Sequence, residues 1–287
     1  MDRYCVMGNP VEHSRSPWIH ARFAELTGQP MDYGRRLVPL GGFAEAVAAF
    51  REEAAAQGGR AGGCNVTVPF KFDAAALADR RSERAELAQA VNTLRFEADG
   101  SVYGDNTDGV GLVNDIERNA GRPLAGAELL LVGAGGAAAG VLGPLLHAGV
   151  RRLVVANRTR DKAVALVQRH AAPARAQGVV LEAQPLDGMS GLARFDVLVN
   201  GTAASLAGDA VPVPAGVLRE GALAVDMMYG PAAAGFLAWA RAQGAEPRDG
   251  LGMLVEQAAE SFTLWRGVAP PAAEVLAELR RIVDTRA

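Results

Sequence analysis

A lysine stands in this sequence where a helix disfavours positive charge. Pro69 predicts the start of a helix, so Lys71 falls in its first turn, where the helix dipole costs a cation a few tenths to about 1 kcal/mol. Asn65 and Thr67 precede it at alternate positions of a predicted strand and therefore share one face. An amide, a hydroxyl and an amine gathered at one strand end indicate a functional lysine.

A carboxylate further along the chain has two interpretations. Asp108 lies in the polar run Gly104–Gly109, next to a predicted helix that Thr107 could cap. As an acid at a helix N-terminus, Asp108 would have a purely structural role. Asn92 is another polar residue at a strand end, in the stretch Ala90–Leu94. A catalytic role and a capping role for Asp108 both fit this pattern.

Two hydroxyls, Ser14 and Ser16, follow a predicted strand over 3–8. Ser16 before Pro17 is a good N-cap for a helix that runs to about Thr27, whereas Ser14 has no such structural duty. Open α/β sheets place ligands at the carboxyl ends of their strands, and two hydroxyls near a helix N-terminus suit an anion. Both hydroxyls could also be simple caps.

The stretch from Glu128 to Thr159 predicts a strand, a glycine turn, a helix and a second strand. Its small residues follow the spacing Gly133-x-Gly135-x-x-Ala138, which matches the dinucleotide fingerprint in its Gly/Ala form. The first glycine permits a tight turn, the second lets a pyrophosphate approach the backbone, and the helix N-terminus faces the phosphates. A glycine turn that binds nothing is the structural alternative, but its place between strand and helix favours a cofactor.

The end of the second strand indicates which dinucleotide is bound. An NAD site normally has an Asp or Glu there for the ribose 2′-OH, but this chain has Asn157. Arg158 and Lys162 can pair with a 2′-phosphate, and Thr159 can donate a hydroxyl. The chemistry of these residues predicts NADP.

Residues 129–150 contain no Asp, Glu, Lys or Arg, a pattern that is also typical of a membrane span. Their many glycines, Pro144, and the flanking Glu128 and Arg151 argue against that alternative. We therefore expect a buried strand and helix, and no membrane partner.

The whole chain has 287 residues, a net charge of -3 and 49% hydrophobic residues. This length predicts two domains, and the charge balance argues against a nucleic-acid partner. The two cysteines, Cys5 and Cys64, fall in predicted strands and are expected to be buried thiols of a cytoplasmic protein, with no basic and apolar leader before the first strand. The four histidines show no metal-ligand spacing, so no metal is expected.

Alternating apolar runs and turn signals predict the remaining elements. Strands are expected near 33–38, 179–183 and 195–199, a strand with its exit over 224–230, a hairpin over 94–104, and helices over 43–57, 82–89, 110–120, 160–170, 233–243, 253–266 and 271–284. The strand ends at 200–202 and 227–230 are expected to face a nicotinamide.

Seven stretches, in order along the chain, resemble the motifs of shikimate dehydrogenases. They are Gly8-Asn9-Pro10 with His13-Ser14-x-Ser16-Pro17, Asn65-Val66-Thr67-Val68-Pro69-x-Lys71, Ala90-Val91-Asn92-Thr93, Gly104-Asp105-Asn106-Thr107-Asp108-Gly109, Gly133-Ala-Gly-Gly-Ala137, Asn157-Arg158-Thr159 and Gly250-Leu-Gly-Met253-Leu-Val-x-Gln257-Ala. The resemblance covers essentially the whole chain.

The resemblance implies an oxidoreductase that uses NADP to reduce 3-dehydroshikimate reversibly to shikimate, in the shikimate pathway of aromatic amino-acid biosynthesis. It implies an α/β fold of two domains: an N-terminal α/β substrate domain over 1–109, completed by C-terminal helices over 250–287, and a Rossmann dinucleotide-binding domain over 110–249. Lys71 and Asp108 match the family's catalytic pair, and either of them could transfer the proton.

Matches to the family's ligand-binding positions fall into two sets. The substrate set comprises Ser14, Ser16, Asn65, Thr67, Asn92, Tyr229 and Gln257. The cofactor set comprises Gly133, Ala134, Gly135, Gly136, Ala137, Asn157, Arg158, Thr159, Lys162, Thr202, Met227 and Gly250.

Three other functions share parts of this pattern. A quinate or quinate/shikimate dehydrogenase with relaxed cofactor use would share nearly every motif. A methylene-tetrahydrofolate-type dehydrogenase would share the two-domain plan but not the motif series, and a non-enzymatic NADP-sensing protein would not need Lys71 and Asp108. A monomer and a homodimer are both compatible with the sequence.

Overall fold

The computed structural model describes residues 1–189, 194–202 and 213–284. The chain forms two compact units. Met1–Gly111 and Leu254–Leu279 make up the first, and Leu112–Met253 with the residues after Leu279 make up the second. The first unit therefore combines segments from both halves of the chain.

The first unit is built on a mixed sheet of six strands in the order β2-β1-β3-β5-β6-β4. The strands are β1 (Asp2–Gly8), β2 (Asp32–Leu37), β3 (Arg60–Val66), β4 (Arg80–Arg81), β5 (Thr93–Phe96) and β6 (Val102–Asp105). β1 is parallel to β2 and β3, whereas β5 is antiparallel to β3 and β6. The pairing of β5 with β6 confirms the predicted hairpin.

The register of this sheet brings polar strand ends together. Asn65 pairs with Thr93 across β3 and β5, and Thr93 pairs with Asp105 across β5 and β6. Because β5 is antiparallel to both neighbours, its first residue meets their carboxyl ends. The segments that carry Thr67 and Asp108 consequently leave the sheet from one edge.

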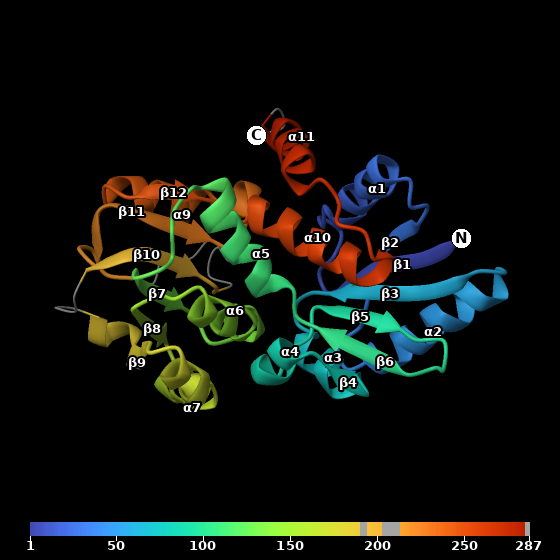
Figure 1. The fold of residues 1–287 in the computed structure, drawn as a ribbon, viewed down its shortest axis with the longest axis horizontal. Coiled ribbons are helices and arrows are strands. Elements are labelled where there is room, and N and C mark those ends of the chain that lie inside the picture. The colour runs from blue at the N-terminus through green and yellow to red at the C-terminus, as the bar shows by residue number, and fades with distance from the viewer. Residues whose placement is uncertain (190–193, 203–212, 285–287) are drawn as a thin grey trace. The chain divides into compact units, whose positions relative to one another are not determined.

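Helices cover both faces of the same sheet (Figure 1). They are α1 (Ser16–Thr27), α2 (Phe43–Ala56), α3 (Lys71–Leu77), α4 (Glu83–Ala88) and α10 (Leu251–Arg266). The last helix, α11 (Ala272–Asp284), is tied to α1 through the ion pair of Arg22 with Glu278. Cys5 of β1 shares an apolar core with Phe43 and Val47 of α2. The neighbouring Tyr4 contacts Trp265 of α10, with ring centroids 4.7 Å apart. Successive residues of β1 thus pack against different helices, as the strand period requires.

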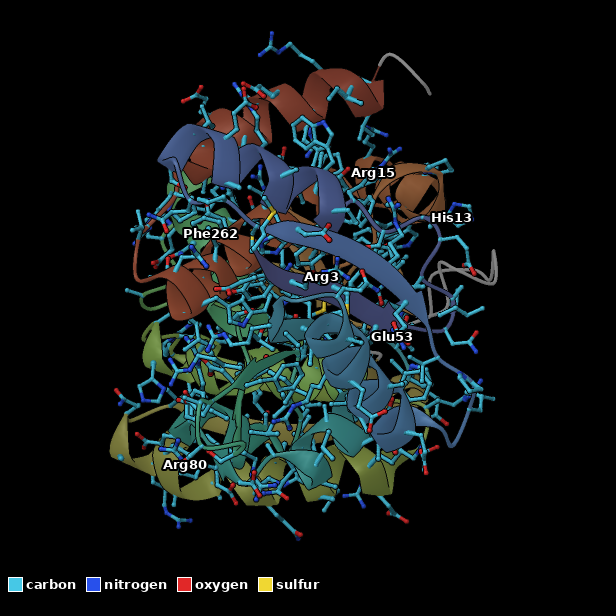
Figure 2. The ribbon with its side chains drawn as sticks, turned by 90° about the vertical axis from the view of Figure 1, so that its right-hand side faces the viewer. Arg3, His13, Arg15, Glu53, Arg80 and Phe262 are labelled. Atoms are coloured by element: carbon cyan, nitrogen blue, oxygen red, sulfur yellow. The ribbon has the colours of Figure 1, made fainter. Side chains whose placement is uncertain are left out.

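α1 and α10 share an aromatic core. Phe262, labelled on α10 in Figure 2, lies with its ring centroid 5.7 Å from that of Phe23 and 6.3 Å from that of His20, both on α1. All three side chains are fully buried. α10, from Leu254 onward, is therefore an integral part of the first unit.

The second unit is a parallel sheet of six strands in the order β12-β11-β10-β7-β8-β9. The strands are β7 (Glu128–Val132), β8 (Arg152–Asn157), β9 (Val180–Pro185), β10 (Phe195–Asn200), β11 (Leu218–Asp226) and β12 (Glu246–Arg248). The helices along this part of the chain are α5 (Asp108–Asn114), continued by the π-helical turn Asp115–Asn119, α6 (Gly136–His147), α7 (Arg160–Ala176) and α9 (Ala234–Ala242), with short 3₁₀ turns at Leu186–Met189 and Gly230–Ala233. Counted from β9, the order is that of the doubly wound dinucleotide-binding fold, which confirms the predicted fold class.

The uncharged stretch 129–150 forms most of the buried strand β7 and all of helix α6. No helix in the described part of the chain is long and apolar enough to cross a membrane. Cys5 and Cys64 are buried free thiols, as predicted. Among residues 1–189, 194–202 and 213–284, no group of three His, Cys, Asp or Glu side chains is placed to hold a metal ion.

The prediction that Ser16 caps α1 is wrong. Ser16 is the first helical residue, and Arg15 occupies the cap position without a side-chain cap hydrogen bond. The N–H of Ser16 donates to Ser14 Oγ at 3.3 Å. The hydroxyl of Ser14 thus takes over part of the capping, because it lies two residues ahead of the first free N–H.

Three further elements of the structure differ from what the sequence predicted. α7 continues to Ala176, beyond the expected end near 170, since the alanine-rich segment that follows favours helix. The strands β4 and β12 were not predicted, because two and three residues are too few to show a period.

Candidate active site

A lysine–aspartate ion pair lies where the polar strand ends meet. Lys71 is the first residue of α3, Asp108 is the first residue of α5, and Lys71 Nζ donates a hydrogen bond to Asp108 Oδ2. Their side chains are 16% and 8% exposed. A charge so far removed from water requires a partner of opposite sign. The pair therefore holds an amine and a carboxylate in direct contact.

Asn92 binds the second oxygen of Asp108. The backbone N–H of Thr107 donates to Asn92 Oδ1 at 2.8 Å, and a backbone N–H can only donate. The amide oxygen of Asn92 therefore faces Thr107, and its Nδ2 faces Asp108 Oδ1 at 2.9 Å and Gln257 Oε1 at 3.2 Å. Four residues predicted for the site, Lys71, Asp108, Asn92 and Gln257, thus belong to one network.

Asn65 joins this network through buried hydroxyls. Its Nδ2 donates to Thr93 Oγ1 at 3.1 Å and to Ser261 Oγ at 3.0 Å, and its Oδ1 accepts from the Tyr33 hydroxyl at 2.7 Å. Burial raises the pKa of Tyr33 well above its usual value, so the hydroxyl remains a donor. Thr93 Oγ1 in turn donates to Asn92 Oδ1 at 2.9 Å.

The two predicted serines lie together at the start of α1, Ser14 in the preceding loop and Ser16 as the first helical residue. Ser14 Oγ donates to Ser16 Oγ at 3.2 Å. The guanidinium of Arg35, on β2, donates to the Ser14 carbonyl oxygen at 2.6 and 3.0 Å. Two hydroxyls next to an arginine form an environment that suits a carboxylate.

Thr67 directly follows β3 and packs against β1. Its N–H donates to Met7 O at 2.9 Å, and its methyl group fills the space that a side chain at Gly8 would need. Its side chain is half-buried. The glycine at the end of β1 therefore allows Thr67 its place at the sheet edge.

The glycine turn of the second unit has the geometry of a phosphate-binding turn. Gly133 adopts φ 111°, and a Cβ atom there would lie 3.0 Å from Gly201 O. A Cβ atom on Gly135 would have no neighbour within 4 Å, and Gly135 immediately precedes α6. Ala134 lies between these two glycines, and Gly136 and Ala137 open the helix. Open space before a helix N-terminus suits an anion.

The end of β8 leads into α7 without a carboxylate at positions 157–159. Asn157 Nδ2 donates to Thr159 O at 2.9 Å, which shapes the turn, and the N–H of Lys162 donates to the same carbonyl at 3.1 Å. Arg158 lies on this turn. Arg158 and Lys162 thus flank a turn that is closed by its own hydrogen bonds.

The remaining predicted cofactor residues also lie in the second unit. A Cβ atom on Gly133 would lie 3.3 Å from Thr202 Cγ2, and one on Gly201 would lie 3.3 Å from Met227 Sδ. A Cβ atom on Gly250 would collide with the carbonyl group of Met227. Thr202, Met227 and Gly250 therefore lie close to the glycine turn or to one another.

Tyr229 is the one predicted substrate residue in the second unit. It follows β11 and precedes the short turn Gly230–Ala233, with a half-buried side chain. The other six, Ser14, Ser16, Asn65, Thr67, Asn92 and Gln257, lie in the first unit.

The structure adds supporting residues that the sequence analysis missed. Thr93 and Thr107 stand beside Asn92 and Asp108 in polar strand ends, and that position was a usable signal. Tyr33 and Ser261 carry no such signal, because a tyrosine in a strand and a serine in a helix are ordinary. Thr93, Thr107 and Ser261 are all fully buried, so their hydroxyls serve the network.

Three family models match the chain. Residues 6–94 match the shikimate dehydrogenase substrate binding domain, residues 115–207 match the family described as shikimate / quinate 5-dehydrogenase, and residues 250–280 match the shikimate 5′-dehydrogenase C-terminal domain.

Individual relatives resemble the chain over nearly its full length. The shikimate dehydrogenase (NADP(+)) of Paracidovorax citrulli is 67% identical over 97% of this chain and 96% of that protein. The crystal structure of an Ael1 enzyme from Pseudomonas putida is 46% identical, with a TM-score of 0.86 over 97% of this chain and 98% of that chain. The shikimate 5-dehydrogenase of Thermus thermophilus in complex with shikimate is 33% identical, with a TM-score of 0.81 over 99% and 100% of the two chains.

Proposed function

The chain belongs to the shikimate dehydrogenase family, and from this premise we propose that it reduces 3-dehydroshikimate to shikimate, reversibly and with NADP. The protein is thus an NADP-dependent oxidoreductase that acts on a CH–OH group. This reaction belongs to the biosynthesis of aromatic amino acids and chorismate.

The hydrogen-bonded pair of Lys71 and Asp108 carries this proposal. Oxidation of a secondary alcohol requires a proton to leave the oxygen as hydride leaves the carbon, so a base must lie within hydrogen-bond reach of the hydroxyl. Asp108 accepts from Lys71 on one oxygen and from Asn92 on the other, and it therefore acts as an orienting carboxylate. Lys71 donates its proton to the carbonyl oxygen of 3-dehydroshikimate as hydride arrives at the carbon, and the neutral amine that results takes the proton back from the hydroxyl of shikimate in the reverse direction.

The residues of the second unit fit NADP, which supplies the hydride chemistry when bound. Gly133, Gly135 and the start of α6 would hold the pyrophosphate, because they leave the backbone accessible before a helix N-terminus. Arg158 would pair with the 2′-phosphate. The remaining cofactor residues would be Ala134, Gly136, Ala137, Asn157, Thr159, Lys162, Thr202, Met227 and Gly250.

The substrate carboxylate is assigned to the hydroxyls of Ser14 and Ser16, and the guanidinium of Arg35 binds the backbone carbonyl oxygen of Ser14. The ring hydroxyls are assigned to the amides and the hydroxyl at the sheet edge. The residues of this second group are Asn65, Thr67, Asn92 and Gln257, with Tyr229 as a further contact.

The domain division follows the same proposal. A substrate domain over 1–109, completed by 250–287, and a nucleotide domain over 110–249 are supported by the compact units, which divide the chain after Gly111 and after Met253. The residues after Leu279 group with the second unit instead of the first. A cytoplasmic location is supported by the free thiols of Cys5 and Cys64. The assembly is a monomer or a homodimer.

Cofactor choice tests the assignment of Arg158. In Arg158→Ala we expect the KM for NADP to rise far more than the KM for NAD, because only NADP carries the 2′-phosphate. Arg169→Ala, an equal charge change within α7, is the matched control and should leave both constants near the wild-type values. Equal effects of Arg158→Ala on the two cofactors would show that Arg158 does not bind the phosphate.

Activity on quinate is the second candidate function, because one of the matching family models is described as shikimate / quinate 5-dehydrogenase. Comparison of kcat/KM for shikimate and quinate, each with NADP and NAD, decides between the two. We expect shikimate with NADP to give the largest value, and a larger value for quinate with NAD would reverse the assignment. NADPH binding without turnover of any of these substrates would indicate a sensing protein.

A further inference from the structure

Asp105 is a buried carboxylate outside the proposed catalytic pair. It ends β6 and is only 3% exposed. Arg84 binds it with both arms of the guanidinium, with Nε 2.7 Å from Oδ1 and Nη2 2.5 Å from Oδ2. The hydroxyl of Ser82 and the N–H of Asn106 also donate to Oδ1, at 2.5 and 2.7 Å. Asp105 is therefore fully hydrogen-bonded although it carries no proposed chemistry.

The short helix α4 is attached to this carboxylate. The hydroxyl of Ser82 accepts from the N–H of Ala85 at 3.2 Å as the N-cap of α4 while it donates to Asp105. Arg84 lies in the first turn of α4, and its Nη2 also reaches Glu260 Oε1 on α10 at 3.0 Å. α4 contains none of the residues assigned to substrate or cofactor. Its Arg84 and its N-cap Ser82 both bind Asp105 instead.

Two hydrogen bonds through Asn106 connect Asp105 to Asp108. Asp105 Oδ1 binds the N–H of Asn106, and the side-chain oxygen of Asn106 accepts from the N–H of Asp108 at 3.2 Å. Asn106 Nδ2 donates to Ala90 O at 2.8 Å. The carbonyl oxygen of Asp105 accepts from the N–H of Asn92 at 3.0 Å. The backbone of both Asp108 and its partner Asn92 is thus tied to Asp105.

Arg84 balances the charge that this arrangement buries. Burial raises the pKa of Asp105, but the hydrogen bonds and charge of Arg84, together with the hydrogen bonds from Ser82 and Asn106, outweigh this effect and leave the pKa below its usual value. Without Arg84, the carboxylate would be buried and uncompensated, a situation that costs several kcal/mol unless the structure moves. Asn106, in the segment that carries Asp108, is bonded directly to this carboxylate, so a shift of the carboxylate would move that segment.

We propose that Arg84 is a positioning residue for the reaction: it fixes Asp105 and, through Asn106, the backbone from which Asp108 orients Lys71. This inference rests on the proposed function. Misplacement of a catalytic group by a fraction of an ångström to 1 Å lowers turnover by up to about 100-fold without removing any contact to substrate.

Three variants test the inference. We expect Arg84→Met and Asp105→Asn to lower kcat by about 10- to 100-fold while the KM for shikimate changes by less than about threefold. Arg84→Lys keeps the charge but lacks the two-armed guanidinium, so its kcat should fall by an intermediate factor. The matched control is Arg95→Met in the adjacent strand β5, because Arg95 also binds a carboxylate with two arms, that of Glu97 at 2.7 and 3.0 Å.

A kcat of Arg84→Met within about twofold of that of Arg95→Met would overturn the inference. A second readout needs no turnover: amide hydrogen exchange at Asn106 and Asp108 should be at least about tenfold faster in Arg84→Met than in Arg95→Met. Equal exchange in the two variants would also overturn it. If the wild-type protein fails to turn over shikimate, the proposed function is wrong, and the exchange rates alone then decide the role of Arg84.

Discussion

Asn92 sets the direction of the hydrogen bonds around Asp108. Its oxygen is committed to the N–H of Thr107, so its NH₂ group must face acceptors. Asp108 accepts from Asn92 on one oxygen and from Lys71 on the other. A carboxylate, which only accepts, matches this arrangement on both oxygens, and an ammonium on Lys71 matches it as donor. Each oxygen of Asp108 thus has its own donor.

Ser14 is predicted to hold the substrate carboxylate. Ser14→Ala should cost about 1–3 kcal/mol of binding, seen mostly in the KM for shikimate, because a charge-assisted hydrogen bond is lost. The measurement is steady-state kinetics with shikimate varied at saturating NADP. Ser101→Ala is the control, since Ser101 binds only Asp99 within the β5–β6 hairpin among its described side-chain partners.

A second experiment tests whether Ser14 and Ser16 bind the carboxylate of the substrate. Shikimate amide lacks the negative charge, and we expect the wild-type enzyme to use it much less well than shikimate. Equal kcat/KM for the two compounds would contradict the role of Ser14 and Ser16.

For these individual residues, the sequence predicted the residue types but not the orientation of their side chains. Polar side chains that interrupt apolar runs are visible in a sequence, so Lys71, Asn92 and Asp108 could be selected. The direction of the Asn92 amide depends on the backbone of Thr107, which reaches it only after β5 and β6 have paired. The N-cap role assigned to Ser16 failed because the helix begins one residue earlier than expected, with Ser16 already helical and its own N–H donating to the hydroxyl of Ser14.

Among the elements, α1 is held on the first sheet by an aromatic cluster around a histidine. His20 is fully buried and stacks on Tyr33 of β2, with ring centroids 4.3 Å apart, and Trp265 of α10 lies 5.3 Å away. Burial lowers the pKa of His20 to about 3. Tyr33 also donates to Asn65, so the cluster supports a residue of the proposed site.

His20 should make the protein less stable in acid. Its pKa is about 3 in the folded protein, against 6.5 for an unperturbed histidine, so the unfolded chain binds the proton more readily as the pH falls from 6.5 towards 3. Within this window each pH unit costs up to about 1.4 kcal/mol of unfolding free energy. We expect His20→Phe, which keeps an aromatic ring, to flatten the decline of unfolding free energy between about pH 6.5 and about pH 4.5, as measured by urea titration.

The exposed His13, in the loop before α1, provides the control variant His13→Gln, whose pH dependence should follow the wild type. An unchanged slope in His20→Phe would show that other groups cause the acid sensitivity. His170, whose pKa burial lowers to about 4, would then be the next residue to test.

The elements themselves were largely predictable, because their apolar periods and turn residues are local. The contacts between these elements were less predictable. Tyr33 and Arg35 lie two residues apart on β2, and one reaches Asn65 while the other reaches Ser14. Nothing in the local pattern of β2 indicates this double role, since both contacts depend on segments far away in the sequence.

For the whole molecule, the second unit was the easier half to predict. Its glycine turn and alternating strands and helices are typical of one strand order, and the structure has that order. The first sheet mixes parallel and antiparallel pairs and is completed by α10 from the far end of the chain. Such long-range pairing leaves no period in the sequence, and the resemblance to a known family, more than any local pattern, indicated that α10 returns.

Turnover of Lys71→Met tests the central claim most directly. Methionine keeps much of the length and packing of the side chain while it removes the charge and the exchangeable proton. General acid–base groups typically contribute about 10²- to 10⁴-fold, so we predict that kcat falls within that range, that the KM for shikimate stays nearly unchanged, and that the basic limb of the pH–rate profile disappears. A variant whose KM rises while kcat stays at the wild-type value would contradict the account, because Lys71 would then only bind substrate and Asp108 would become the candidate base.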